Sequence, residues 1–314
     1  DTRLGLLAAA FESGVIHLYS LYSVEDMVRD TSRRQGSATV LLRVPPVRTF
    51  QAPGFHPTSL ALALCQGRLR VVAGCLEGAI VCFGVSEQEE RDSFPEFIGS
   101  DTSPEAVTGV MFSNEANCVA GVGHDPTYCF KVWDVRFPPR PMAKVNARNK
   151  NSWATSCARI GEVKIVGHQN GDLSLIKQDT KEVTRKSLHI TDACIWTVAV
   201  NQGSGALAVS SSEGRVRTIP MRGTQGRVVN SAVPCIIRTL AVSKDANGKV
   251  DRLVFGEEEE AGSGTEKKVE DPEVIMLRSV YSLVWNPTPT LEFWLAMGGG
   301  SGLVELQMVR QMRT

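Results

Sequence analysis

The sequence predicts an all-β protein, specifically a β-propeller of about six to seven four-stranded blades. The main observation is a hairpin pattern that recurs six times along the 314 residues. Each copy has an apolar run, a turn that usually contains Gly, and a strand in which apolar and polar residues alternate. A second observation is that no stretch offers three turns of amphipathic helix, which argues against doubly wound α/β folds.

The first hairpin illustrates the pattern. An apolar run at 6–11 leads through Ser13 and Gly14 to an alternating strand at 15–21. Gly suits such a turn because it adopts a positive φ without steric cost. The same order recurs at 71–83, 118–135, 164–176, 207–219 and 294–306.

The spacing of the turns fits repeated blades. Four consecutive turns lie 43 to 47 residues apart, at Gly78, Asp125, Gly171 and Gly214. A four-stranded propeller blade takes roughly 40–45 residues. The longer intervals, 14–78 and 214–302, each require an insertion, and the second contains a polar, acidic stretch at about 256–274.

Three further runs suit the innermost strand of a blade, at 107–112, 195–200 and 280–285. The first unit begins at its second strand, near Leu4. We therefore expect 1–314 to be a single propeller domain that forms the C-terminal majority of the ring. Upstream residues, which are missing here, or a partner would complete it, because a cut ring exposes strand edges.

Composition excludes several classes of protein. Hydrophobic residues make up 42% and charged residues 22%, which excludes global disorder. Lys+Arg and Asp+Glu are both 34, so net charge indicates neither a nucleic acid nor a membrane as the main partner. The longest apolar runs, such as 60–65, fall short of the roughly 18 residues of a membrane span. The eight Cys include no CxxC pair, which favours buried free thiols in a reducing compartment.

The sequence contains no convincing catalytic, metal or cofactor site. The Gly-rich run at 298–302 precedes an alternating strand rather than a helix, so we interpret it as a hairpin turn and not a phosphate loop. The five His are dispersed, and Asp125 beside His124 is expected to cap turn amides. Ser210, Ser211 and Ser212 lack the context of a nucleophile elbow. We predict a protein that is not an enzyme, with no cofactor and no small-molecule substrate.

Two locally basic runs are candidate phosphate or partner contacts. The first has no acidic residue among its members, which are Arg136, Arg140, Lys144, Arg148 and Lys150. The second follows Glu213 and begins with Arg215 and Arg217. Clustered Arg and Lys attract phosphate, but connections on a propeller rim are often charged in any case. Similarly, the acidic stretch is either a solvated loop or a contact for a basic partner.

Two sets of motifs resemble known proteins. Residues 130–136, with Trp133 and Asp134, resemble the end of a WD repeat, although the Gly-His dipeptide that opens such repeats is absent. Residues 4–21 resemble one blade of the WD-repeat subunit of general transcription factor IIIC. The runs 284–287 and 294–304 resemble its final blade, and the order of these matches is the same.

The resemblance implies a WD-repeat-like propeller that is a nuclear, non-enzymatic scaffold. Its partners would be other subunits of the factor, including a second WD-repeat subunit, within an assembly that supports promoter recognition and initiation by RNA polymerase III. Contact with promoter DNA would be indirect or auxiliary, and no membrane is involved. The alternative is a WD-repeat adaptor of another intracellular complex, in ubiquitin ligation, trafficking or chromatin. Two irregular intervals, and the absence from this sequence of the family's N-terminal extension, depart from the pattern.

Overall fold

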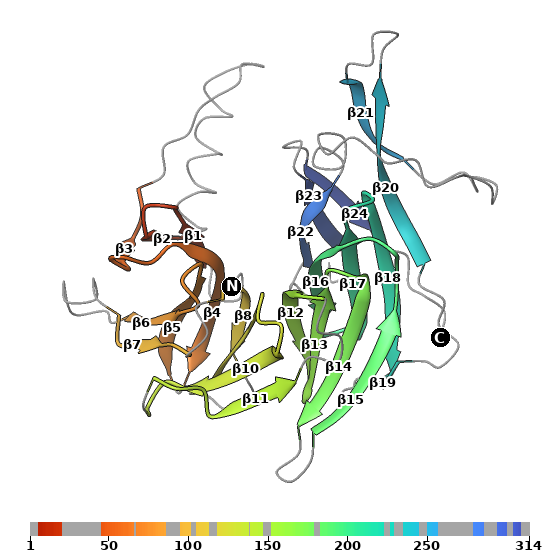
Figure 1. Ribbon diagram of the computed structural model, residues 1–314. Helices are drawn as coiled ribbons and strands as arrows, with labels where there is room; N and C mark the ends of the chain where they lie inside the picture. Colours follow the sequence, from red (N-terminus) through yellow and green to blue (C-terminus); the bar gives the residue numbers. More distant parts are fainter. Residues whose placement is uncertain are drawn as a thin grey trace. The chain divides into compact units, whose positions relative to one another are not determined.

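The computed structural model describes most of the chain (Figure 1). The described residues are 6–20, 45–65, 67–85, 95–101, 105–112, 118–137, 139–146, 152–178, 183–222, 227–228, 235–244, 250–256, 279–285, 294–299 and 304–308. Within these ranges every regular element is a β-strand, which confirms the all-β prediction. These ranges include no helix that could cross a membrane.

The chain divides into two compact units, each of which we describe by itself. The first comprises 1–125 and 131–144, and the second comprises 126–130 and 145–314.

The first unit carries three antiparallel sheets. One sheet is ordered β1-β2-β3, from β1 (Leu6–Ala10), β2 (Val15–Ser20) and β3 (Arg48–Gln51). The next is ordered β4-β5-β6-β7, from β4 (Pro57–Cys65), β5 (Arg68–Cys75), β6 (Ile80–Val85) and β7 (Phe97–Gly99). The third is ordered β8-β9-β10-β11, from β8 (Val107–Phe112), β9 (Cys118–Gly123), β10 (Tyr128–Asp134) and β11 (Ala143–Asn146). The boundary between the units falls within β10 and β11.

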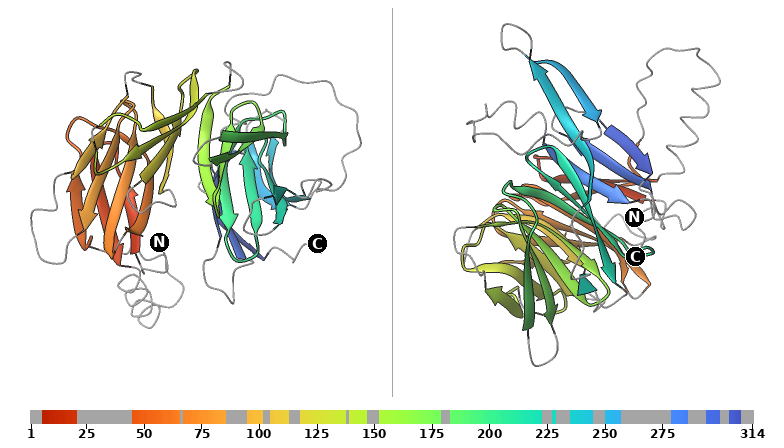
Figure 2. Two further views of the ribbon diagram at one scale, coloured as in Figure 1. Left: turned by 90° about the horizontal axis from the view of Figure 1, so that it is seen from below. Right: turned by 90° about the vertical axis from the view of Figure 1, so that its right-hand side faces the viewer.

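The second unit carries three more sheets (Figure 2). The first is β12 (Ala154–Ile160), β13 (Val163–His168), β14 (Asp172–Gln178) and β15 (Val183–His189). The second contains β16 (Ile195–Asn201), β17 (Ala206–Ser211), β18 (Arg215–Arg222), β19 (Arg227–Val228), β20 (Cys235–Lys244) and β21 (Val250–Gly256). The third is β22 (Val280–Trp285), β23 (Trp294–Gly299) and β24 (Val304–Met308).

The six predicted hairpins are confirmed. They are the antiparallel pairs β1–β2, β5–β6, β9–β10, β13–β14, β17–β18 and β23–β24. Four of the predicted turn glycines have a φ of 79° to 81°: Gly14, Gly78, Gly171 and Gly214. Gly302 lies outside the described residues. The three runs predicted as innermost strands are β8, β16 and β22, and each is the first strand of its sheet.

The number of described strands differs from the predicted four in three of the six sheets. Three sheets have four described strands, and the first and last sheets have three. The fifth has six, because β20 pairs with β18 through its first half and with β21 through its second half. The long interval 214–302 therefore contains an additional strand pair, which lies before the insertion predicted at about 256–274 (Figure 1). The acidic stretch from Glu257 to Asp271 lies outside the described residues.

Burial of both faces explains why the second strands are nearly continuous apolar runs in the sequence. On β5, Val71 packs in a cluster with Phe50 and Phe83, whereas the next residue, Val72, packs with Val119 and Trp133. Successive side chains of a strand point to opposite faces, so both faces of β5 are buried. The second unit repeats this arrangement on β17, where Leu207 and Ala208 belong to different clusters.

Candidate functional site

At one end of four sheets, the connection that precedes the first strand meets the turn between the second and third strands. We call this the turn end of the sheet. In four sheets a backbone N–H of the turn donates to a carbonyl of the connection, over 2.8 to 3.0 Å: Leu76 to His56, His124 to Ala106, Gln169 to Trp153 and Ser212 to Cys194. The turn ends are therefore fixed by backbone pairing, independently of residue type.

Side chains reinforce the turn end of the β4–β7 sheet in the first unit. The backbone N–H of His56 donates to Glu77 Oε2 over 3.0 Å, and the imidazole Nδ1 contacts Oε1 of the same carboxylate. Burial raises the pKa of Glu77, but these hydrogen bonds and the His56 charge outweigh burial and hold the pKa below its ordinary value. Glu77 therefore remains an ionised acceptor at neutral pH.

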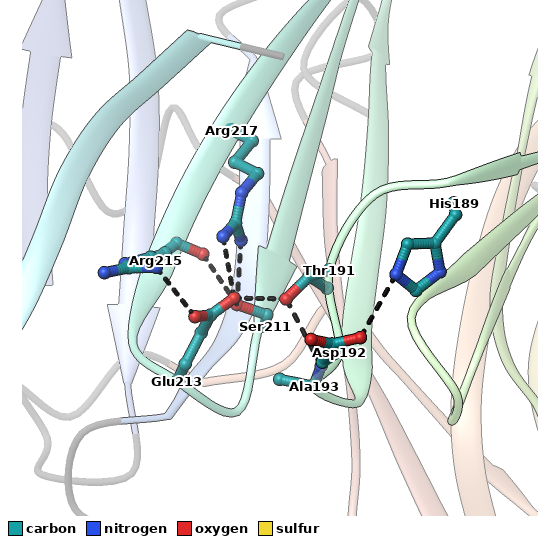
Figure 3. A network of polar contacts seen from close by, with 8 residues as sticks. All are labelled: His189, Thr191, Asp192, Ala193, Ser211, Glu213, Arg215 and Arg217. Carbon is teal, nitrogen blue, oxygen red and sulfur yellow. Dashed lines mark hydrogen bonds and ion pairs between the residues drawn. The ribbon is translucent and has the colours of Figure 1, made fainter. Parts of the chain in front are cut away.

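Glu213 is the centre of the equivalent network in the second unit (Figure 3). The hydroxyl of Thr191, in the connection before β16, donates to Glu213 Oε1. Arg217 Nη2 lies 2.7 Å from the same oxygen, and Arg215 Nη1 lies 3.0 Å from Oε2. Ser211 Oγ is 3.4 Å from both Glu213 Oε1 and Arg217 Nη1. One carboxylate thus joins the connection, the turn and the start of β18.

Electrostatics keep Glu213 charged despite its burial. Burial raises its pKa, but hydrogen bonds from Thr191 and Arg217 and the charges of Arg217 and Arg215 outweigh burial, so the pKa lies below its ordinary value. The Arg217 side chain is only 9% exposed. A buried guanidinium requires this partner, because an unpaired buried charge is strongly unfavourable.

His189 joins two carboxylates beside this network. Its Nδ1 lies 2.9 Å from Asp172 Oδ1, and its Nε2 lies 3.3 Å from Asp192 Oδ1. The hydrogen bond to Asp172 is the main reason that the pKa of His189 is raised, and Asp192 contributes in the same direction. The imidazole is exposed, so we interpret it as a connector between the end of β15 and the start of β14.

The described members of the first basic run are largely paired. Arg136 donates to both carboxylate oxygens of Asp134, over 2.9 and 2.6 Å, and lowers the pKa of that carboxyl. Lys144 Nζ lies 2.9 Å from Asp101, which also binds Lys131. Arg140 is exposed. Arg148 and Lys150 lie outside the described residues.

The first two arginines of the second basic run share one carboxylate. Arg215 and Arg217 both bind Glu213, so one of their two charges is compensated within the protein. Asp125, expected to cap turn amides, forms an ion pair with Lys131, and both side chains are about 90% buried. Four members of the two runs, Arg136, Lys144, Arg215 and Arg217, therefore lie against carboxylates of the protein.

Sequence reasoning did not identify the Thr191–Glu213 and His56–Glu77 pairs. Each consists of a residue shortly before the first strand of a sheet and a residue of the turn between its second and third strands. Ser152 and Asn170 occupy the same two places in the β12–β15 sheet, with Asn170 N donating to Ser152 Oγ over 3.2 Å. Alignment of the repeats on their turn glycines is the signal that finds these pairs.

Other chemistry in the described ranges is sparse. No group of three His, Cys, Asp or Glu side chains there could hold a metal ion. Seven cysteines are free thiols: Cys65, Cys75, Cys82, Cys118, Cys129, Cys157 and Cys194. Burial raises the pKa of several of them, to about 12 for Cys75, Cys82 and Cys157, so these thiols are poor nucleophiles.

Comparisons with known proteins give a structural likeness only. No protein-family model matches the chain, and no curated protein matches its sequence. The β-propeller domain of Cps50 (Swd1) from Myceliophteria thermophila matches with a TM-score of 0.58 at 14% identity, over 98% of this chain and 95% of that one. A chain of the mitotic checkpoint complex matches with a TM-score of 0.48 at 18% identity, over 66% of this chain and 58% of that one. Together with the repeated antiparallel sheets, the first likeness shows that the chain has the fold of a WD-repeat-like β-propeller.

Proposed function

We propose that this chain is a non-enzymatic interaction scaffold in a multisubunit transcription factor of the IIIC type, which supports promoter recognition and initiation by RNA polymerase III. The fold supports the general part of this proposal, because WD-repeat propellers are generally scaffolds for protein partners. The specific part rests on the resemblance of 4–21, 284–287 and 294–304 to blades of that factor's WD-repeat subunit. These segments include hairpin β1–β2, the last two residues of β22 and the whole of β23.

The observation that carries the scaffold role is a group of exposed apolar side chains in the second unit. Trp153, which precedes β12, is 42% exposed, and Tyr281 and Val284 on β22 are 36% and 57% exposed. Strands β12 and β22 both pack against β16, so these side chains belong to two sheets that each contact the β16 sheet. Exposed apolar and aromatic groups are typical of protein interfaces.

Charge supports a protein rather than a nucleic acid as the main partner. Lys+Arg and Asp+Glu are equal in number, whereas a dedicated DNA-binding domain carries a positive excess. Arg136, Lys144, Arg215 and Arg217 are bound to carboxylates. The exposed Arg140, together with Arg148 and Lys150, would contribute an auxiliary contact with promoter DNA in the assembled factor.

The test is isolation of the full-length protein at its natural level, followed by cross-linking and identification of the partners that are present in stoichiometric amounts. We expect a nuclear assembly that contains a second WD-repeat subunit and other subunits of an RNA polymerase III factor. Stoichiometric association with a ubiquitin ligase, a trafficking coat or a chromatin complex would support the adaptor alternative instead. Nuclear exclusion of the tagged protein would contradict the proposed localisation.

A further inference from the structure

The edge of β1 that faces away from β2 carries no strand among the described residues. We call this edge, from Ala8 to Glu12, the open edge. The hairpin beside it is closed by two backbone bonds, from Phe11 N to Val15 O over 2.8 Å and from Gly14 N to Phe11 O over 3.0 Å. The same two bonds, at 2.9 and 3.2 Å, close the β5–β6 hairpin. Strand β1 therefore corresponds to β5, whose equivalent edge pairs with β4.

The hairpin bonds show which backbone groups face the open edge. Backbone groups of successive residues in a strand point alternately to its two sides. Phe11 bonds toward β2, so the backbone groups of Ala8 and Ala10 and the N–H of Glu12 point to the open edge. Glu12 corresponds to Leu76, whose N–H donates to the connection before β4. Among the described residues, the N–H of Glu12 has no such acceptor.

Five other sheets show what an edge of this kind accepts. In each of them a first strand pairs antiparallel with the second strand, and its second residue is bulged out of the ladder. Its third residue is small and lies opposite the position that Ala10 occupies on β1, and its fourth residue is apolar or Cys. The third and fourth residues are Ser59 and Leu60, Gly109 and Val110, Ser156 and Cys157, Thr197 and Val198, and Ser282 and Leu283.

In three of these first strands the bulged residue is a threonine that bonds to the second strand. The donors are the hydroxyls of Thr58, Thr108 and Thr155, and the acceptors are the carbonyls of Gly74, Val122 and Gly167, at 3.0, 3.4 and 3.1 Å. The carbonyl of Ala10 is the equivalent acceptor on β1. A hydroxyl at the bulge thus compensates for the interrupted ladder.

The sequence places this pattern in three segments only. Thr followed by Ser or Gly and then by Leu, Val or Cys occurs at 58–60, 108–110 and 155–157. All three segments already pair with the second strand of their own sheet. A folded second copy of this chain therefore offers no spare segment with this pattern, and the occupant of the open edge has to come from a different protein.

The core side of the open edge is apolar and incompletely covered. Ala8 and Ala10 on β1, and Leu60 and Leu62 on β4, are only partly buried against the same core cluster. The first strands of neighbouring sheets pack against each other, as β4 does against β8. A strand on the open edge would therefore lie beside β4 and bury these four side chains further. No charged residue occurs at 6–11, 58–62 or 108–112, so the match is apolar rather than ionic.

We propose that the open edge of β1 binds an extended segment of a partner subunit that carries Thr, a small residue and an aliphatic residue in succession. The segment runs antiparallel to β1, its Thr hydroxyl donates to Ala10 O, and the carbonyl two residues before the Thr accepts from Glu12 N. This inference rests on the proposed scaffold function and specifies how the scaffold joins a partner. Addition of a strand to an exposed sheet edge is a common mode of peptide recognition.

The probe is a fluorescent peptide with the sequence of residues 105–112, Glu-Ala-Val-Thr-Gly-Val-Met-Phe. Titration with the full chain should give a saturable rise in anisotropy, half complete below about 1 mM, as for recognition of one short segment. Hydrogen exchange should slow over 8–12 and stay unchanged over β3. The peptide with Met111→Pro lacks the N–H that faces the second strand, so it should bind at least about tenfold more weakly.

A variant of the chain tests the same bond from the other side. Glu12→Pro removes the N–H at the second position of a tight turn, where Pro is favoured, so it should melt as the wild type does. It should bind the peptide about fivefold more weakly, as for one lost hydrogen bond. Glu12→Ala keeps the N–H and should bind as the wild type does. Leu76→Pro removes the equivalent N–H where it is bonded, so it should lower the melting temperature.

Four outcomes would overturn the proposal. Two are the absence of saturable peptide binding and wild-type affinity in folded Glu12→Pro, and the proline peptide tests the edge even without that variant. Exchange over 8–12 that is as slow as over 72–76 in the isolated full-length protein would assign the edge to a segment of the same polypeptide. Exchange that slows with protein concentration would assign it to a second copy.

Partner isolation from cells separates this inference from the proposed function. A stoichiometric assembly that persists around a chain with no affinity for the peptide removes only the strand site. Peptide binding by a chain that has no partners in cells removes only the scaffold.

Discussion

Arg217 reaches back across the β17–β18 turn to Glu213, with Nη2 2.7 Å from Oε1 and an arginine side chain that is 9% exposed. Thr191 donates to the same carboxylate from the connection before β16. Arg215 forms a second ion pair with this carboxylate, so the turn end of this sheet is held by two ion pairs and by a hydrogen bond from Thr191, which lies 22 positions away in the chain.

Glu213→Gln should destabilise the second unit by about 2–3 kcal/mol, because it leaves the Arg217 guanidinium buried without a charge partner. Chemical denaturation measures the change in the free energy of unfolding. Glu162→Gln is the matched control, since Glu162 is 70% exposed and lies 3.7 Å from Lys177. It should cost less than about 0.5 kcal/mol. Equal effects of the two variants would mean that the Glu213 network is structurally unimportant.

His168 should make stability depend on pH. It is buried beside Ser174, and burial, with the charge of Arg185, lowers its pKa to about 4. The unfolded state takes up this proton near its ordinary pKa of about 6.5, so stability is complete above that pH. It falls as the pH decreases toward 4, by up to about 3 kcal/mol.

Denaturation of the wild type and of His168→Gln between pH 4 and pH 7 tests this prediction. The variant should lose less stability across the window. His189→Gln should lose slightly more stability than the wild type as the pH falls. The raised pKa of this exposed histidine stabilises the wild type at low pH, and that contribution is lost as the pH rises. A steeper pH dependence in His168→Gln would contradict the assignment.

Gly171→Ala should destabilise the protein by at least about 2 kcal/mol more than Gly54→Ala. Both glycines have a positive φ, of 81° and 79°. A Cβ at Gly171 would lie 1.6 Å from Thr191 O, whereas a Cβ at Gly54 meets nothing within 4 Å. The comparison, made by thermal and chemical denaturation, separates steric conflict from the conformational cost. Similar losses of stability in both variants would show that the connection before β16 can move away from the added methyl group at little cost.

Arg140→Ala should leave stability and partner assembly unchanged, because Arg140 is exposed. In the assembled complex it should weaken DNA binding and reduce the slope of log K against log salt by about 0.9 for a lost phosphate contact. Replacing Arg136, Arg140, Lys144 and Arg148 together should enlarge the DNA effect and still preserve assembly. Tight, specific binding of promoter DNA by the isolated chain at physiological salt would contradict the scaffold proposal.

Deletion of 257–271 should leave the fold intact. The stretch contains four consecutive glutamates, then Gly, Ser and Lys, and such a composition buries too little apolar surface to offset the entropy of ordering. Circular dichroism and the melting temperature provide the measurement. Unfolding of the deletion variant would show that the stretch is part of a packed element.

The sequence by itself determined the elements that depend on local rules. Turn glycines such as Gly14 and Gly171 were identifiable because a tight turn requires a positive φ at one position, and Gly is the residue that adopts it without steric cost. The second strands were identifiable because both of their faces are buried, which produces an apolar run. The β20–β21 pair was missed although Asn247 and Gly248 stand between two apolar runs, because the extra length of the interval 214–302 was assigned to the polar stretch at about 256–274.

Only the tertiary structure decided which side chains meet. Arg217 looked like part of a basic surface because its sequence neighbours are basic, but the fold buries it against Glu213. Trp196 and Tyr281 are 85 positions apart in the numbering, and nothing local to either residue indicates that β16 and β22 bring their rings together. Alternation and turn chemistry act between near neighbours in the chain, whereas ion pairs, ring contacts and burial depend on strands that only packing makes adjacent.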